Sequence, residues 1–243
     1  MSYAMSAPIA VRASESARAA FIRRTYAHLA GAILAFACIE FLIFGLVPKE
    51  NLDSVMASAF RSPVTMLVVF LAFIGVGWLA RMWAHADTSP GVQYFGLAIY
   101  VVVQAVLFVP LLWIAVYYIQ DRSVIPTAGV LTLSLFAGLT LAVFITRKDF
   151  SFLGPILSIT SMVVLGVIVC AIIFPGLFGG LGIWFSLAMI ALASAFILYD
   201  TSNVLHHFRT DQHVAASLEL FASVAFLFYH ILRVLIMLAA SRE

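Results

Sequence analysis

The stretch Ala215–Ala240 constrains this chain most, because it is long and apolar enough to cross a bilayer and still carries charge. About 20 apolar residues are enough to span the hydrocarbon layer. With a helical step of about 100° per residue, its polar side chains all fall within about 40° of Glu219, on one narrow stripe. The members of this stripe are Glu219, Ser223, His230 and Arg233, with Phe226 interrupting it.

A charged side chain at the centre of a bilayer costs at least about 2.5–3.5 kcal/mol, so the stripe cannot face lipid. It must face water or other helices. The rest of the circumference consists of Leu, Val, Ile, Phe and Ala. The stretch is therefore predicted to be a central helix that the remaining spans enclose.

Composition supports a membrane class for the whole chain. The sequence is 64% hydrophobic and 10% charged, against about 45–50% and 25% in soluble domains. A net charge of +2 gives no reason to expect nucleic acid as a partner. Cys38 and Cys170 both lie inside apolar runs, which provides no disulfide or metal framework. We expect no cofactor and no resident metal.

Seven apolar runs are separated by polar breaks that contain proline, glycine or charge. In lipid only helices satisfy the backbone within such long, continuous runs. The expected fold class is all-α, a polytopic integral membrane protein of seven transmembrane helices with the seventh central. The runs are Thr25–Val47, Pro63–Trp83, Val92–Tyr118, Val124–Thr146, Leu153–Phe174, Leu181–Val204 and Ala215–Ala240.

Two regions are expected: a polar cytoplasmic tail over residues 1–22 and a transmembrane domain over residues 23–243. The tail is expected to be disordered at first and then to enter the membrane as an interfacial helix near Phe21–Tyr26. No cleavable targeting segment is visible, because the first apolar run is too long for the core of a signal peptide.

The distribution of Lys and Arg predicts the orientation, since cytoplasmic segments carry an excess of both. With the N-terminus inside, eight such residues are inside and four outside, which favours a cytoplasmic N-terminus. The inner residues are Arg12, Arg18, Arg23, Arg24, Arg81, Arg147, Lys148 and Arg209; the outer ones are Lys49, Arg61, Arg122 and Arg242.

This orientation brings three charges to a similar depth. Arg81 and Asp200 fall near the inner ends of the second and sixth spans, and Glu219 lies about one turn inside the seventh. We therefore predict a cluster of Asp200, Glu219 and Arg81, with Ser223 one turn further along the same face as Glu219. Carboxylates and an arginine in a medium of low dielectric form a site that can respond to pH or to a cation. A static Asp200–Arg81 ion pair that joins helices is the alternative interpretation.

Three segments resemble the Bax-inhibitor family of seven-span membrane proteins, and the likeness extends over the whole chain after the tail. The segments are 147–155 (RKDFSFLGP), 196–201 (FILYDT) followed by His206 and His207, and 217–221 (SLELF) running on to Leu232 and Arg233.

The resemblance, to bacterial-type members in particular, implies six helices around a central seventh. It also implies a pH-sensitive calcium leak, with two aspartates on the sixth and seventh spans and an arginine on the second. Asp200 matches the first aspartate and Arg81 the arginine. The second aspartate falls on Ser223, and the asparagine that usually follows it falls on Phe226. Glu219, on the same face, is the candidate to replace the missing carboxylate.

The remaining charged and polar residues of the spans have simpler interpretations. Glu40 and Arg233 fall at matching depth, which favours a structural ion pair over a role in an ion pathway. His230 is either titratable or a buried, hydrogen-bonded imidazole. The three histidines of the sixth-to-seventh connection, His206, His207 and His213, are interpreted as solvated loop residues without the spacing of a metal site, and the alternative is that they tune a response between pH 5 and 8.

The sequence thus favours a non-enzymatic protein of a bacterial inner membrane, whose partners are the lipid bilayer and, as permeant species, calcium and protons. The alternative function is a non-conducting regulator or scaffold that binds other membrane proteins, and Phe226 as a plug favours it. A retinal-binding sensor is excluded, since Lys49 and Lys148 are the only lysines and both lie in loops. Asp200 has no second aspartate within a span, which excludes an intramembrane aspartyl protease.

Overall fold

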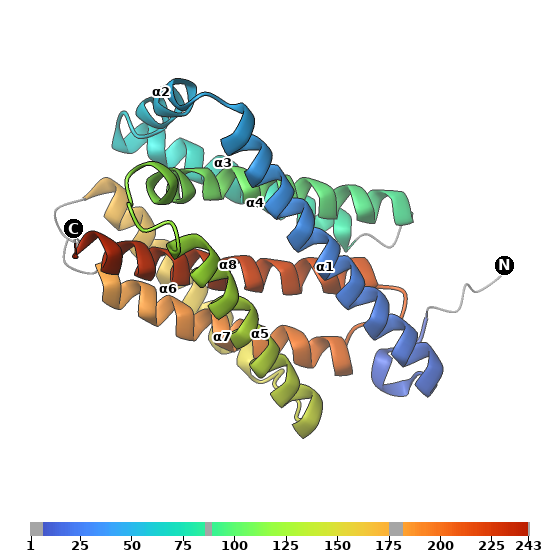
Figure 1. Cartoon of the computed structure of the whole chain (residues 1–243). Coiled ribbons are helices and arrows are strands. Elements are labelled where there is room, and N and C mark those ends of the chain that lie inside the picture. Colours follow the sequence, from blue (N-terminus) through green and yellow to red (C-terminus); the bar gives the residue numbers. More distant parts are fainter. Residues whose placement is uncertain (1–6, 86–88, 175–181, 243) are drawn as a thin grey trace.

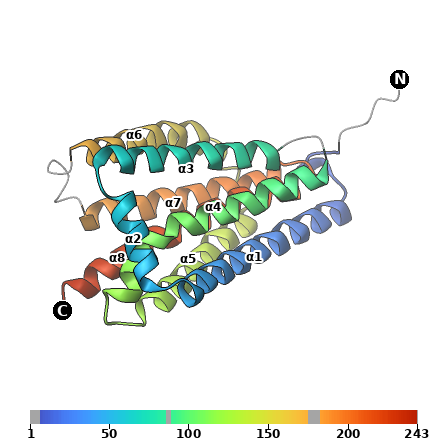
Figure 2. The same cartoon turned by 90° about the horizontal axis from the view of Figure 1, so that it is seen from above.

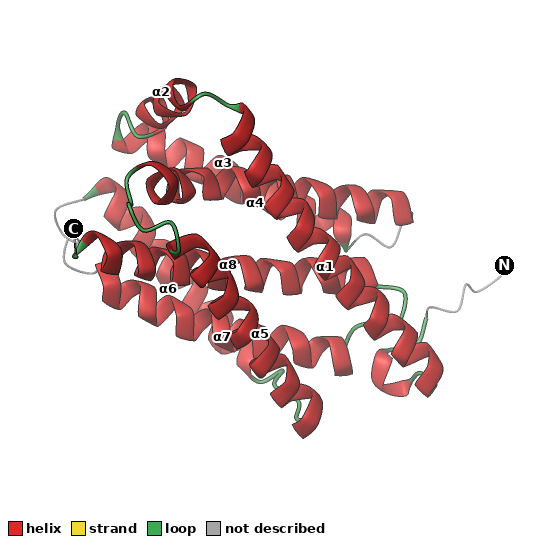
Figure 3. Cartoon of the chain, in the orientation of Figure 1, coloured by secondary structure: helices red, strands yellow, loops and turns green. Residues whose placement is uncertain are grey.

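The computed structural model describes residues 7–85, 89–174 and 182–242, and these form a bundle of long helices (Figures 1 and 3). Within these ranges, seven helices are long and apolar enough to cross a membrane. This confirms the predicted fold class. In chain order the elements are a 3-10 turn at Ala10–Arg12, α1 (Glu15–Leu46), α2 (Lys49–Ala59), α3 (Pro63–Ala84), α4 (Pro90–Tyr117), α5 (Val124–Thr146), α6 (Leu153–Ile173), α7 (Gly182–His206) and α8 (His213–Ala240).

Helix α8 occupies the centre of the bundle, as its polar stripe predicted (Figures 1 and 2). It packs against α1, α3, α4, α5 and α7, whereas α6 packs on the outside against α3 and α7. Leu218, Leu220, Leu227 and Leu232 of α8 are fully buried. Large apolar side chains on the surrounding helices are exposed instead, among them Phe41, Ile145 and Trp184. An apolar surface of this extent is expected of a protein that lipid surrounds.

The starts of three spans follow from local sequence signals. The Ser14, Ser62 and Ser89 side chains accept hydrogen bonds from the backbone N–H groups three residues later. Pro63 and Pro90 stand directly after two of these caps, where proline fits because the first N–H groups of a helix need no intrahelical partner.

The short helix α2 was not predicted, because its sequence was interpreted as a loop. Leu52 and Met56, one turn apart, pack against Val109 of α4, and the Trp113 indole N–H donates to Asp53 at 2.9 Å. A helix of 11 residues with an apolar stripe of about two residues is too short to stand out against seven long apolar runs.

The N-terminal segment also differs from the prediction. Helix α1 begins at Glu15, inside the expected tail, and residues before it dock on the connection between α7 and α8. The Ala10 N–H donates to the Phe208 carbonyl at 2.8 Å and the Thr210 N–H to that of Pro8 at 3.1 Å. Ala10 is fully buried. The expectation of disorder at the start of the tail falls on residues 1–6, which lie outside the described residues. From Pro8 on the segment is held in place, which the sequence did not predict because backbone pairing with another loop leaves no periodic signal.

Close contact between α3 and α4 fixes the position of Arg81. A Cβ atom added at Gly96 of α4 would lie 2.6 Å from the Ala80 carbonyl oxygen and 2.6 Å from the Ala84 nitrogen. Both alanines are buried. Small residues on both helices let the two backbones approach, as is usual for helix pairs in membranes.

Substitution of Gly96 should therefore disturb this helix pair. In Gly96→Ala the added methyl group meets backbone atoms, which cannot rotate away, so we expect the melting temperature in detergent to fall by about 2–10 °C. Gly75→Ala in the same helix pair is the control, since no atom of the described ranges lies within 4 Å of a Cβ there. Equal melting temperatures for the two variants would contradict this packing.

The connection between α5 and α6 is tied to the end of α7 by Asp149. Its carboxylate accepts from the Ser151 N–H at 2.9 Å and contacts the His207 imidazole at 3.2 Å. The Ser202 hydroxyl donates to the same carboxylate at 3.3 Å and accepts from the Phe150 N–H at 2.8 Å. The Ser151 N–H lowers the pKa of Asp149 to about 2 from 3.8, and the His207 side chain acts in the same direction.

A carboxylate whose pKa is depressed by folding stabilises the fold above its unfolded pKa and loses that contribution as the pH falls through its folded pKa. Asp149→Asn should therefore lower the melting temperature between about pH 5 and pH 7, and this difference should vanish toward pH 2. Since Asp149 and His207 are both about half exposed, the effect should not exceed about 1 kcal/mol. Thermal unfolding of both proteins over this pH range measures it; a difference that grows in acid would contradict the assignment.

Candidate functional site

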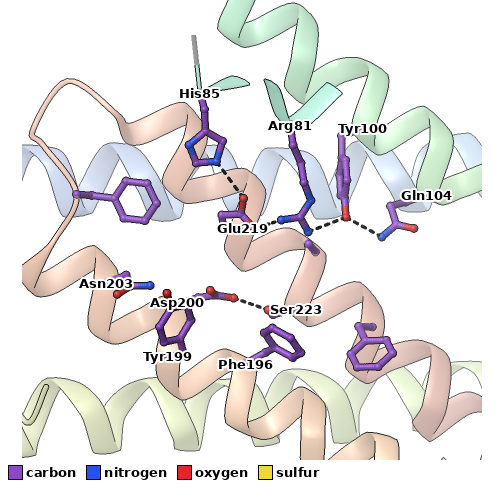
Figure 4. A pocket seen from close by; sticks show the side chains of 13 residues that line it. Arg81, His85, Tyr100, Gln104, Phe196, Tyr199, Asp200, Asn203, Glu219 and Ser223 are labelled. Carbon is purple, nitrogen blue, oxygen red and sulfur yellow. Dashed lines mark hydrogen bonds and ion pairs between the residues drawn. The ribbon is translucent and has the colours of Figure 1, made fainter. Parts of the chain in front are cut away.

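A polar pocket of about 610 Å³ lies between α3, α4, α7 and α8, near the end of the bundle where α8 begins (Figure 4). Its polar side chains come in pairs spaced four residues apart, so that each pair shares one face of its helix. The pairs are Arg81 and His85 at the end of α3, Tyr100 and Gln104 on α4, and Glu219 and Ser223 on α8, while α7 contributes Tyr199, Asp200 and Asn203.

Glu219 is held by two cationic or potentially cationic groups. The Arg81 guanidinium donates to Glu219 Oε2, and His85 Nε2 lies 3.0 Å from Glu219 Oε1. The second guanidinium nitrogen of Arg81 donates to the Tyr100 hydroxyl at 3.3 Å, to which the Gln104 amide also donates at 3.4 Å. The Glu219 side chain is only 20% exposed. A carboxylate buried to this degree requires such partners, because an isolated ionised group would be strongly destabilising.

Asp200 forms the other half of the pocket. Its side chain is buried and accepts a hydrogen bond of 2.5 Å from the Ser223 hydroxyl. Figure 4 shows Asp200 and Ser223 below the level of Glu219, with the Arg81 guanidinium turned toward Glu219. The static Asp200–Arg81 ion pair of the alternative interpretation is therefore not formed between these two described residues.

The four residues of the predicted cluster, Arg81, Asp200, Glu219 and Ser223, all line this single pocket. Their convergence follows from depth along the helices, which the positions in the sequence fix. His85, Tyr100 and Gln104 were missed. His85 could have been predicted, because it lies one helical turn after Arg81 and therefore on the same face of the helix. Tyr100 and Gln104 have the same spacing of four residues on the next helix.

Aromatic packing follows the pocket along α8. Phe226 lines the pocket wall and packs edge-on against Phe196 and against His230, with a centroid distance of 4.9 Å to His230. His230 in turn contacts Phe185, and the Arg233 guanidinium lies 5.8 Å from the centroid of the same Phe185 ring. The polar stripe of α8 is thus divided: its first half opens into the pocket and its second half is packed against rings. His230 is buried, and its Nδ1 atom has no hydrogen-bond partner in the described part of the chain.

The predicted ion pair between Glu40 and Arg233 is wrong. Glu40 is buried in α1, yet neither of its carboxylate oxygens has a hydrogen-bond partner among the residues that the structure describes. Arg233 instead makes a cation–π contact with Phe185 on α7. The depth of a residue along the bundle axis does not determine the direction in which its helix turns the side chain.

The three histidines near the α7–α8 connection have separate partners rather than forming one group. His206 Nδ1 lies 3.0 Å from the Ser202 carbonyl, His207 contacts Asp149, and His213 Nε2 lies 3.2 Å from the Tyr94 hydroxyl. His206 and His213 lie within α7 and α8 rather than in the loop, whereas His207 is exposed and follows the end of α7, as the interpretation of solvated loop residues implies for it alone.

Fold and pocket together define a class: a polytopic membrane protein of seven spans whose central helix carries a buried carboxylate site. The comparison with known families is more specific. The family model described as "Inhibitor of apoptosis-promoting Bax1" matches residues 18–241, and the chain belongs to the Bax inhibitor family.

Relatives extend across bacteria, viruses and animals. An uncharacterised protein of Pseudomonas aeruginosa is 27% identical and the match covers 70% of this chain and 73% of the relative. The Golgi anti-apoptotic protein of vaccinia virus is 25% identical, and protein lifeguard 4 of Mus musculus is 27% identical. Each of these two matches covers 92% of this chain and 87% of the relative.

The geometry predicts unequal effects of neutralising the two carboxyl groups on stability. Glu219→Gln removes the charge that Arg81 and His85 contact, so it should cost about 1–3 kcal/mol, after allowance for the partial exposure of Arg81. Asp200→Asn keeps an oxygen that accepts from Ser223 and should cost less. Thermal unfolding in detergent compares the two variants; a larger loss for Asp200→Asn would contradict the observed pairing.

Proposed function

We propose that the protein conducts calcium passively through the membrane and that the pocket carboxylates gate this leak. The observation that carries the proposal is the convergence of Asp200 and Glu219, from the two most closely packed helices, on one cavity beside Arg81. Carboxylate, hydroxyl and amide oxygens are the ligands that Ca²⁺ prefers. Membership of the Bax inhibitor family supports the proposal, since the resemblance of the sequence implies this activity.

The proposed gate depends on the contact between the Arg81 guanidinium and the Glu219 carboxylate. While Glu219 is ionised, its contact with Arg81 ties α8 to α3, and the Asp200–Ser223 hydrogen bond ties α8 to α7. Protonation of Glu219 removes the charge that holds the guanidinium, which loosens α3 from α8. A buried carboxylate that changes charge thereby biases the positions of the helices, which is the usual form of a pH switch. Phe226 also lines the pocket, and we expect its ring to move when the helices separate.

Reconstituted protein tests the leak. Liposomes loaded with a calcium indicator should take up Ca²⁺ faster with the protein than without it between about pH 6 and pH 8. The rate should fall several-fold for Asp200→Asn, which removes a pocket charge, whereas Glu219→Gln leaves Arg81 without its partner at every pH and should abolish the dependence of the rate on pH. Glu50→Gln, an exposed carboxyl on α2, is the control and should leave the rate unchanged.

A second function, a non-conducting regulator that binds other membrane proteins, is favoured by the packed rings of Phe226, His230 and Phe185 beyond the pocket. The name of the vaccinia relative, an anti-apoptotic protein, is compatible with such a role. Flux no higher than in empty vesicles over the whole pH range, from protein that remains folded, would decide for the regulator and against the leak.

A further inference from the structure

Two histidines and a tyrosine from three different helices converge at the end of the bundle where α8 begins. His28 Nε2 of α1 lies 3.1 Å from the Tyr94 hydroxyl oxygen of α4, and His213 Nε2 of α8 lies 3.2 Å from the same oxygen. The centroids of the two imidazole rings are 5.0 Å apart. Neither the carboxylate pocket nor the family resemblance uses these three residues, and the pocket lining does not include them.

The tautomer of the neutral His28 ring follows from the contact that its other ring nitrogen makes. His28 Nδ1 lies 2.6 Å from the Arg24 backbone carbonyl, which can only accept, so Nδ1 carries the proton and donates. Neutral His28 therefore presents a bare Nε2 lone pair toward Tyr94. A histidine that donates its other N–H to a backbone carbonyl is the arrangement in which metal-binding imidazoles are usually held.

The distances also suit a metal ion. Metal–nitrogen bonds of about 2.0–2.1 Å in tetrahedral geometry place neighbouring ligand atoms about 3.3 Å apart. The two nitrogen–oxygen distances of 3.1 and 3.2 Å are close to this separation and lie at the long end of the range for hydrogen bonds. Two imidazole nitrogens and a phenolate oxygen favour divalent transition metals such as Zn²⁺ or Cu²⁺, whereas Ca²⁺ prefers an all-oxygen shell.

We propose that His28, Tyr94 and His213 form a binding site for a divalent transition-metal ion, which would join α1, α4 and α8. Tyr94 is 42% exposed, so the site is open for entry of the ion and for a water molecule as fourth ligand. In the 7–85, 89–174 and 182–242 ranges no three His, Cys, Asp or Glu side chains gather as a metal group. The Tyr94 phenol is therefore the third protein ligand. Because tyrosine is not among the usual metal ligands, the spacing of the histidines in the sequence did not predict the site.

Binding has a defined proton balance. Without metal, the His213 Nε2–H donates to the Tyr94 oxygen, whose own proton is donated to His28. With metal, the His213 proton moves to Nδ1, and the Tyr94 proton is released as the phenolate binds. About one proton should thus leave for each metal ion bound. Arg24 and Asp211, of opposite charge, are the charged side chains that act on His213 besides His28.

Copper binding tests the site on the full chain, purified without a polyhistidine tag. One equivalent of Cu²⁺ should give an electron paramagnetic resonance spectrum with splitting from two nitrogens. His28→Ala and His213→Ala should each lose this spectrum, whereas His207→Ala, an exposed histidine at the same end, should keep it. Zn²⁺ should compete for the same site and raise the melting temperature of the wild type but not of the two variants.

Tyr94→Phe serves as the second variant, since it keeps both histidines and removes only the phenol. It should weaken Cu²⁺ binding by at least about tenfold and abolish the release of a proton. Glu219→Gln should leave copper binding unchanged, which separates this site from the proposed calcium pocket. A two-nitrogen spectrum that survives in both folded histidine variants, or its absence from the wild type, would overturn the proposal.

Discussion

The contact of Arg81 with Glu219 is the interaction on which the rest of the structure depends. A carboxylate in the first turns of a membrane-spanning helix is tolerated only if protein surrounds it and a cation accompanies it. The close approach of α3 and α4 at Gly96 lies beside Arg81, at the end of α3 that also contacts α8. The need to satisfy one charge therefore determines which helix lies at the centre and which helices flank the pocket.

Much of the fold could be predicted from the sequence because a bilayer allows few solutions. Seven long apolar runs become seven helices, and the stripe on Ala215–Ala240 requires the last helix to be enclosed. The elements that were missed obey other rules. Helix α2 is short and amphipathic, and the segment at Pro8–Ala10 is held by backbone hydrogen bonds to Phe208 and Thr210, which no side-chain pattern encodes.

The candidate site was predictable in its members but not in its pairing. Depth along each helix follows from counting residues, and it correctly brought Arg81, Asp200, Glu219 and Ser223 together. Rotation about each helix axis is set by packing against neighbours, and it decided that Arg81 contacts Glu219 and not Asp200. The same limit explains Glu40, which was expected at the depth of Arg233 but finds no hydrogen-bond partner for either carboxylate oxygen among the described residues.

Ser223 gives the pocket a particular asymmetry. A second aspartate at this position would place two like charges on adjacent helices, and these would have to share a proton or a cation. With serine there, Asp200 receives a hydroxyl donor, and the second carboxylate lies one turn earlier on α8, where Arg81 and His85 contact it. The two carboxyl groups thus have partners of different kinds: Glu219 contacts the Arg81 guanidinium, whereas Asp200 accepts from a neutral hydroxyl group. Any response to protons must therefore begin at two sites of different character, because loss of the Glu219 charge frees Arg81, whereas protonation of Asp200 removes no ion pair.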